Sequence, residues 1–251
     1  MTAGLTALGL LAAALPMAAH ADPGADWTLD VGLAARVRPV HLGSERFTSD
    51  ALPILEASYG DRLTFSLDDG AKATLWRAGP WTAGPVVEYR QSYNDRLPEG
   101  AFRMPDAVEV GGFASRRTPV GVAELRMRKA VSGYQGWSGD LAFDTGGQVA
   151  PKWKLGAEAR LSWADSNFSR EYFGLHRLDG PAMSLPRFSR DDFYSVGLEL
   201  DAARQLGPRT ALVAALSGDR VIGEGFEGPL LETRNLVTFG LGATYRFGPG
   251  R

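Results

Sequence analysis

Apolar and polar residues alternate one by one along several long stretches of the chain. In the closing stretch, residues 235–247, Phe239, Leu241 and Tyr245 share one face, while Gly240 and Thr244 share the other. The same alternation runs through residues 27–38, 122–130, 137–146 and 153–163. A period of two is that of a β-strand, and these runs are about as long as a tilted strand needs to cross a bilayer. The pattern predicts an all-β chain.

Two features indicate which face of the strands contacts lipid and which contacts water. Aromatic residues gather at the strand ends, as in an interfacial girdle: Trp27, Tyr59, Trp81, Tyr89, Trp137, Trp153, Trp163, Tyr245 and Phe247. The polar face mixes glycine, serine and threonine with charges of both signs. Apolar and polar residues also alternate along the strands of a soluble sandwich or a lipocalin-like barrel, but there the apolar face points inward. The girdle and the mixed polar face favour a transmembrane barrel with its apolar face toward lipid.

The connections between the runs alternate in length. Short ones fall at residues 59–61, 78–80, 116–119, 148–152 and 205–209, and long polar ones at 39–51, 91–106, 165–192 and 223–234. Short periplasmic turns and longer outer loops are typical of outer-membrane barrels. The break at Asp68-Asp69-Gly70 makes residues 62–67 and 71–77 a short hairpin. We therefore expect a closed antiparallel barrel of about twelve strands, an even number.

Composition excludes some classes of protein. The chain has 27 Lys and Arg against 29 Asp and Glu, a net charge of -2, which gives no electrostatic basis for a nucleic-acid partner. It has no cysteine, so disulfides and thiolate metal sites are excluded.

The N-terminus has the features of an export signal. Residues 5–19 form an apolar core, and Ala19-His20-Ala21 fits a small-residue cleavage site. An apolar N-terminal helix is the alternative. We expect residues 1–21 to be a signal peptide and residues 22–251 to be the barrel domain. Beyond residue 21 no apolar run approaches the ~18 residues of a membrane-spanning helix.

Charged residues on the polar face are expected to point into the lumen. This predicted network, either structural or pore-lining, comprises Asp30, Arg36, Glu56, Glu88, Arg90, Glu109, Glu124, Arg126, Glu158, Arg160, Glu199 and Arg246. Barrels of about eight strands are filled by side chains, whereas those of about sixteen hold channels, and twelve lies between. A near balance of acidic and basic residues favours a packed, ion-paired interior or a narrow pathway.

The longest connection, residues 165–192, mixes aromatic residues with arginines, a combination common in recognition surfaces. Its candidate contact residues are Phe168, Arg170, Tyr172, Phe173, Arg177 and Arg187. They could contact lipopolysaccharide phosphates or an external partner, or fold into the barrel mouth. Packing against neighbouring loops explains them equally well.

The sequence gives little support for a catalytic site or a metal site. His41 and His176 lie in different loops, and no nucleophile-elbow pattern surrounds Ser44, Ser169 or Ser184. A triad needs a base within reach of its nucleophile. We expect no catalytic residue, no cofactor and no metal.

Several stretches resemble the MipA/OmpV family of outer-membrane proteins. They are LGSERF with LPILEASYGDRL (42–63), AELRMRKAVSGYQGWSGDLAF (123–143), LSWADSNFSREYFGL (161–175) and the closing YRF. The resemblance covers nearly the whole chain after the signal. One departure is the tail Gly248 to Arg251 after the terminal aromatic, which bears on the efficiency of assembly rather than on the fold.

The resemblance implies a barrel in the outer membrane of a Gram-negative bacterium. It also implies a scaffold role, since the name-giving member is associated with a murein lytic transglycosylase and a bifunctional murein synthase. A narrow channel, and an adhesin or lipopolysaccharide-contact protein acting through residues 165–192, remain alternatives. The residues themselves single out none of the three.

Overall fold

The structure, a computed structural model, describes residues 27–92, 96, 105–172, 192–222 and 232–249. The expected signal peptide lies outside these residues. The strands are β1 (Trp27–Pro39), β2 (Phe47–Tyr59), β3 (Leu63–Ser66), β4 (Gly70–Ala73), β5 (Trp76–Ala78), β6 (Trp81–Arg90), β7 (Ala107–Thr118), β8 (Gly121–Ala130), β9 (Trp137–Ala150), β10 (Trp153–Ala164), β11 (Phe193–Gln205), β12 (Thr210–Ile222) and β13 (Asn235–Phe247).

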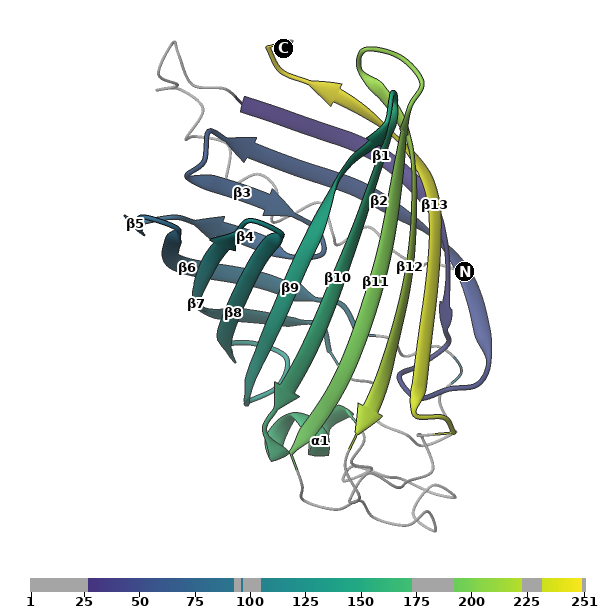
Figure 1. Ribbon diagram of the computed structural model, residues 1–251. Coiled ribbons are helices and arrows are strands. Elements are labelled where there is room, and N and C mark those ends of the chain that lie inside the picture. Colours follow the sequence, from purple (N-terminus) through teal and green to yellow (C-terminus); the bar gives the residue numbers. More distant parts are fainter. Residues whose placement is uncertain (1–26, 93–95, 97–104, 173–191, 223–231, 250–251) are drawn as a thin grey trace.

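These strands form one antiparallel sheet that closes into a barrel (Figure 1). Sequence neighbours pair except β4 and β5, β1 pairs with β13, and β4 pairs with β6. β4 and β5 both pair with β6, so they are two pieces of one interrupted strand. Counted so, the barrel has the twelve antiparallel strands that the alternation predicts, and the predicted fold is confirmed. Closure of the sheet allows strands to form backbone hydrogen bonds on both sides. Lipid requires this because it offers no water to pair with free N–H and C=O groups.

The two faces of the wall carry different side chains. On β13, Val237, Phe239 and Leu241 are exposed on the outside, whereas Thr238 and Gly240 between them are half-buried on the inside. The exposed large hydrophobic residues of β1, β8, β11 and β12 follow the same alternation. A soluble barrel would bury this face. The outer surface is therefore suited to lipid.

Most predicted turns and loops agree with the structure. The predicted hairpin within residues 62–77 is present as β3, β4 and β5. The first long connection is shorter than expected, since β2 begins at Phe47 rather than after Ala51. Phe47 to Asp50 extend the ladder with Arg36 to Pro39, and Arg36 and Arg38 both bond to Asp50.

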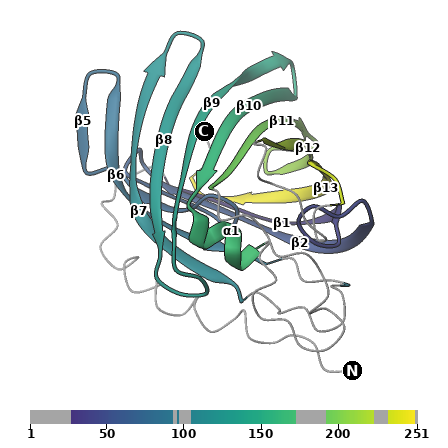
Figure 2. The same ribbon diagram turned by 90° about the horizontal axis from the view of Figure 1, so that it is seen from below.

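One helix, α1 (Ser166–Tyr172), follows β10 and lies within the outline of the barrel mouth (Figure 2). Asp165 caps it, since its Oδ1 accepts the N–H groups of Asn167 and Phe168, both at 3.1 Å. Within the described residues no helix is long and apolar enough to span a bilayer.

Candidate functional site

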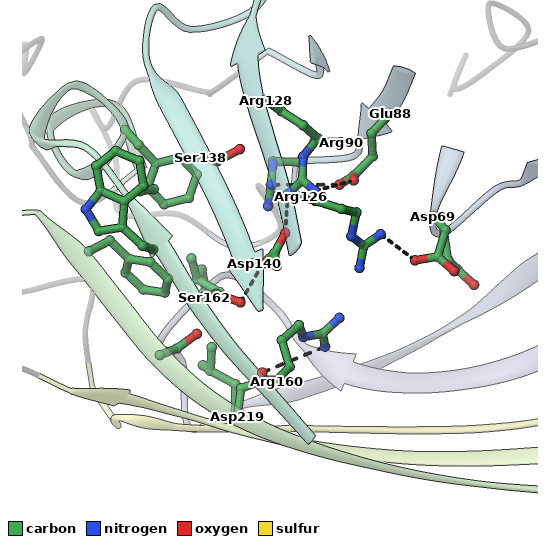
Figure 3. A pocket seen from close by; sticks show the side chains of 18 of the residues that line it. Asp69, Glu88, Arg90, Arg126, Arg128, Ser138, Asp140, Arg160, Ser162 and Asp219 are labelled. Atoms are coloured by element: carbon green, nitrogen blue, oxygen red, sulfur yellow. Dashed lines mark hydrogen bonds and ion pairs between the residues drawn. The ribbon is translucent and has the colours of Figure 1, made fainter. Parts of the chain in front are cut away.

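The buried charges of the lumen concentrate on β6, β7, β8 and β9. Arg126 and Arg128 of β8 are almost fully buried, while Leu125 and Met127 beside them are exposed on the outside. Residues 126 and 128 share one face because side chains alternate along a strand, so both arginines point to the interior. Figure 3 shows them pointing toward the carboxylates of Asp69, Glu88 and Asp140.

Glu109 of β7 is the most enclosed carboxylate, with no exposed surface. It accepts hydrogen bonds from Arg90 Nε at 2.7 Å, Arg128 Nε at 2.9 Å and Ser138 Oγ at 2.8 Å, and from the Tyr134 hydroxyl. Four donors from four different segments thus converge on one carboxylate. Hydrogen bonds to an ionised group are about twice as strong as neutral ones, so Glu109 ties these segments together.

Arg128 extends the cluster to β6 and β9. Its Nη1 lies 3.2 Å from Glu88 Oε2, and its Nη2 donates to Asp140. Asp140 also accepts a hydrogen bond from Ser162 of β10 at 2.7 Å. The guanidinium therefore joins carboxylates of β6, β7 and β9, and Asp140 carries the connection to β10.

The turn between β3 and β4 is bonded to this cluster. Asp69 accepts a hydrogen bond from Arg126 Nη1 at 2.7 Å, and Lys72 Nζ donates to Glu124 at 3.0 Å. β6 and β7 separate β4 from β8 in the sheet, so these contacts span the inside of the barrel rather than adjacent strands. The hairpin thereby fixes a bridge of charges within the lumen.

A cavity of about 330 Å³ lies beside this bridge, toward the outer end (Figure 3). Its charged lining includes Arg126, Arg128, Asp140 and Arg160, and its apolar lining includes Phe168. Arg160 is 3.3 Å from Glu158 and 3.8 Å from Asp219. The cavity thus has fixed donors and acceptors of both signs.

The structure places all the predicted lumen charges on the inner face, most of them in ion pairs. The remaining pairs are Asp30 with Arg246 at 2.6 Å and Arg36 with Asp50 at 2.9 Å. Glu56 and Glu199 have no hydrogen bond or ion pair within the described part of the chain. These two carboxylates are available to water or to a cationic solute.

Several members of the network were absent from the predicted set, namely Asp50, Asp69, Lys72, Arg128, Asp140 and Asp219. Five of them lie at inward positions of strands, so the alternation alone could have identified them. Asp69 is different, because it lies in a turn and alternation says nothing about where a turn points.

The outer mouth holds a small aromatic core. Phe168 of α1 is 4% exposed and packs against Tyr134 and Phe193, with ring centroids 5.4 and 5.5 Å away. Arg90 lies 5.6 Å from the Phe168 ring, which connects this core to the Glu109 cluster. Phe168 thus folds into the barrel mouth and does not face an external partner.

The other candidate contact residues of the long loop are not placed. Arg170 and Tyr172 belong to α1, but their side chains are outside what the structure describes, as are residues Phe173, Arg177 and Arg187 entirely. Their contact role stays a prediction.

Asp165→Ala is expected to destabilise α1 by about 1 kcal/mol, because two N–H groups at the helix start lose their acceptor. The Trp137 N–H also loses its bond to Oδ2, at 2.9 Å. Hydrogen exchange measured by mass spectrometry should speed up in residues 137 and 166–169. Exchange of the Val120 N–H, in the turn between β7 and β8, should not change. Faster exchange throughout the barrel would contradict a local cap.

The outer loops are linked by Glu232. Its Oε2 accepts the Glu45 N–H at 2.9 Å and the Ser44 hydroxyl at 3.1 Å, and these bonds hold the pKa of the carboxyl below its usual range. A lowered pKa means that this contact is complete above the ordinary glutamate pKa and is lost as the pH falls through the folded value.

Exchange of the Glu45 N–H, corrected for intrinsic rates, should therefore accelerate below about pH 4. The N–H of Val40, which donates to the Arg46 carbonyl oxygen at 2.9 Å, is the internal control. Glu232→Gln should remove the pH dependence at Glu45. The same pH dependence in that variant would contradict the assignment.

Two contacts bear on the predicted absence of a catalytic triad. The Ser44 hydroxyl donates to Glu232, and His41 Nδ1 lies 3.2 Å from the Leu42 carbonyl oxygen. Among the described residues, no three His, Asp or Glu side chains are grouped so that they could hold a metal ion.

Comparison with protein families gives one match. The model of the family described as "MltA-interacting protein MipA" matches residues 31–247, the bulk of the chain. A search of curated proteins finds no match.

Several solved structures are similar at low identity. OmpT, an outer membrane protein of Vibrio cholerae, is 8% identical, with a TM-score of 0.40, over 89% of this chain and 97% of that one. The anion-selective porin from Comamonas acidovorans is 10% identical, with a TM-score of 0.40, over 89% and 99%. Neisserial surface protein A is 12% identical, with a TM-score of 0.30, over 89% and 97%.

Proposed function

Because the chain belongs to the family of the MltA-interacting protein MipA, we propose that this outer-membrane β-barrel is a scaffold for murein-remodelling enzymes. The partners proposed are a murein lytic transglycosylase, which the family description suggests, and a bifunctional murein synthase. We also propose that residues 1–21 are removed as a signal and that residues 22–251 form the mature barrel.

One observation in the lumen carries the structural part of this proposal. Ion pairs join Asp69 to Arg126, and Glu88 through Arg128 to Asp140, on the lumen side of β6, β8 and β9. A wide pore keeps its centre free for water. Buried pairs that join the β3–β4 turn to β8 and β9 suit a rigid anchor better.

The periplasmic turns offer a surface for such partners. Val120, Val149 and Leu206 are more than half exposed at these turns, and Lys152 and Arg209 lie beside the last two. Exposed apolar side chains rimmed by charge are typical of protein-interaction sites. The turns are short, so the proposal requires a compact contact, smaller than the ~800 Å² per partner of a standard interface.

Co-purification tests the scaffold role. Purified barrel should retain a soluble lytic transglycosylase and a murein synthase, and the double variant Val120→Asp with Leu206→Asp should reduce retention at least tenfold. Val131→Asp, equally exposed at the outer end, is the matched control and should leave retention unchanged. No retention by the wild-type barrel, or equal loss in the control, would overturn the proposal.

A narrow cation pathway is the second candidate, favoured by the inward carboxylates that lack a partner. Glu56, Glu199 and Asp201 form no ion pair among the described residues, so a conducting lumen would attract cations. Conductance with a cation preference that falls in Glu199→Gln would support this candidate.

We further propose contact with lipopolysaccharide at the outer rim. Lys129 Nζ lies 5.7 Å from the centre of the Trp137 ring, on strand ends at the level of the outer girdle. An ammonium beside an interfacial aromatic ring is suited to a lipid phosphate.

A further inference from the structure

One arginine beside the lumen cavity leaves its hydrogen-bond donors unused. Arg160 of β10 lies 3.3 Å from Glu158 Oε1 and 3.8 Å from Asp219 Oδ1, yet it donates no hydrogen bond to any described residue. Its side chain is 28% exposed, and it lines the cavity of about 330 Å³. A guanidinium has five N–H donors in a planar fork that matches a carboxylate. Arg160 is therefore suited to bind a carboxylate that enters the cavity.

An acceptor lies on the same wall, two strands away. Arg160 pairs with Gly197 of β11, and Gly197 pairs with Asp219 of β12, so the three residues form one inward row. The Asp219 carboxyl lies over Gly197, since a Cβ placed on that glycine would be 2.2 Å from Asp219 Oδ1. Asp219 lines the cavity and accepts no hydrogen bond from a described residue. Figure 3 shows Asp219 beside Arg160 and apart from the pair of Arg126 and Asp69.

The other arginines of the cavity have acceptors within the protein. Arg126 donates to Asp69, Arg128 to Asp140 and Glu109, and Arg90 to Glu109. Among the arginines described around the cavity, Arg160 alone donates no hydrogen bond. The open donors and an open acceptor thus lie together in one row of the wall.

Apolar side chains begin beside this row and continue to the outer mouth. Leu236 of β13 pairs with Asp219, and it packs against the buried cluster that contains Phe168 and Phe193. All three apolar residues line the cavity. Phe193 lies four positions before Gly197 on β11, which places it about 13 Å nearer the mouth. The cavity is therefore charged at its inner end and apolar at its outer end.

We propose that this cavity binds a small zwitterion of the α-amino-acid type with an apolar side chain. The carboxylate of the ligand accepts hydrogen bonds from Arg160, and its ammonium group donates to Asp219. Its side chain lies against Leu236 and the rings of Phe168 and Phe193. This proposal is independent of the scaffold role.

Charge and size both favour such a ligand. A buried charge is costly unless it is paired. A simple anion would leave Asp219 without a partner, and a simple cation would do the same to Arg160, whereas a zwitterion pairs with both. Ligand sites range from about 300 to 1,000 Å³, so the cavity of about 330 Å³ suits a small molecule.

Equilibrium dialysis of radiolabelled L-phenylalanine against the refolded barrel in detergent micelles tests the proposal, with protein-free micelles as the blank. We expect saturable binding of one molecule per barrel. Phenethylamine, which lacks the carboxylate, and phenylpropionate, which lacks the ammonium group, should each compete at least tenfold more weakly than unlabelled phenylalanine. The absence of saturable binding would mean that the cavity holds only water, and it would overturn the proposal. Equal competition by either analogue would also overturn it, because one charged group would then suffice.

Two glycine variants provide a matched pair. Gly197→Ala places a methyl group where the Asp219 carboxyl lies, so it should weaken binding at least fivefold. Gly156→Ala is the control, because Gly156 is an inward glycine of β10 and a Cβ placed on it would be 2.1 Å from Asp201 Oδ1. Neither Gly156 nor Asp201 is among the described residues that line the cavity. Binding to the Gly156→Ala barrel should therefore equal that of the wild type.

Arg160→Gln removes the proposed partner of the carboxylate and should weaken binding at least tenfold. Heat-modifiable gel mobility first shows that each variant is folded. Unchanged binding in the folded Arg160→Gln and Gly197→Ala barrels would contradict the site. An equal loss in the Gly156→Ala barrel would contradict it as well, since the effect would then not depend on the cavity.

Discussion

Glu109→Ala is expected to lower the free energy of unfolding by about 3–5 kcal/mol. Removing one partner of a buried ion pair leaves the other charge buried without compensation, and that is the costly case. Here two guanidinium groups, of Arg90 and Arg128, lose a carboxylate that is wholly enclosed, and Ser138 and Tyr134 lose their acceptor. Urea unfolding of the barrel in lipid vesicles, followed by tryptophan fluorescence, measures the change.

Glu199→Ala is the matched control for this prediction. Glu199 is also an inward glutamate of the lumen, but it has no hydrogen bond or ion pair among the described residues. Its removal should change the free energy of unfolding by less than about 0.5 kcal/mol. Similar losses in the two variants would mean that the Glu109 cluster contributes nothing specific to stability.

Leu241→Arg should cost about 2–4 kcal/mol and impair assembly, since Leu241 lies mid-strand on the lipid face and is 46% exposed. Charged side chains at the bilayer midplane of a barrel are destabilising to this extent. The measurement is the fraction of protein that shows heat-modifiable mobility after folding into vesicles, together with the urea midpoint.

Thr244→Arg is the companion variant on the same strand. Thr244 faces the lumen opposite Gly32 and is half-buried, so the new guanidinium points into the lumen rather than into lipid. We expect a much milder effect on both measurements. If both variants folded equally well, the assignment of the two faces would be wrong.

The sequence predicts the strands well because each must carry its own alternation. Residues 235–247 show it without interruption, and β13 has the same bounds. The even number of strands expected of the barrel also predicts the hairpin within residues 62–77, although both of its arms are short. The inward charges follow from the same period, which explains why Asp30, Arg126 and Arg160 could be identified from the sequence alone.

Contacts that depend on where turns and loops point could not be predicted. Asp69 reaches Arg126 because the short β3–β4 hairpin leaves its turn beside the lumen. Phe168 could equally have faced outward, and its burial depends on Tyr134 and Phe193, which are distant in sequence.

Single-channel conductance of the refolded barrel in a planar bilayer, after a gel confirms heat-modifiable mobility, tests most directly whether ion pairs occupy the lumen. We expect the membrane to stay at its baseline current with the wild-type protein. Steady conductance steps that grow with salt concentration would contradict an ion-paired lumen, because they require a water-filled path past Arg126, Arg128 and Asp69.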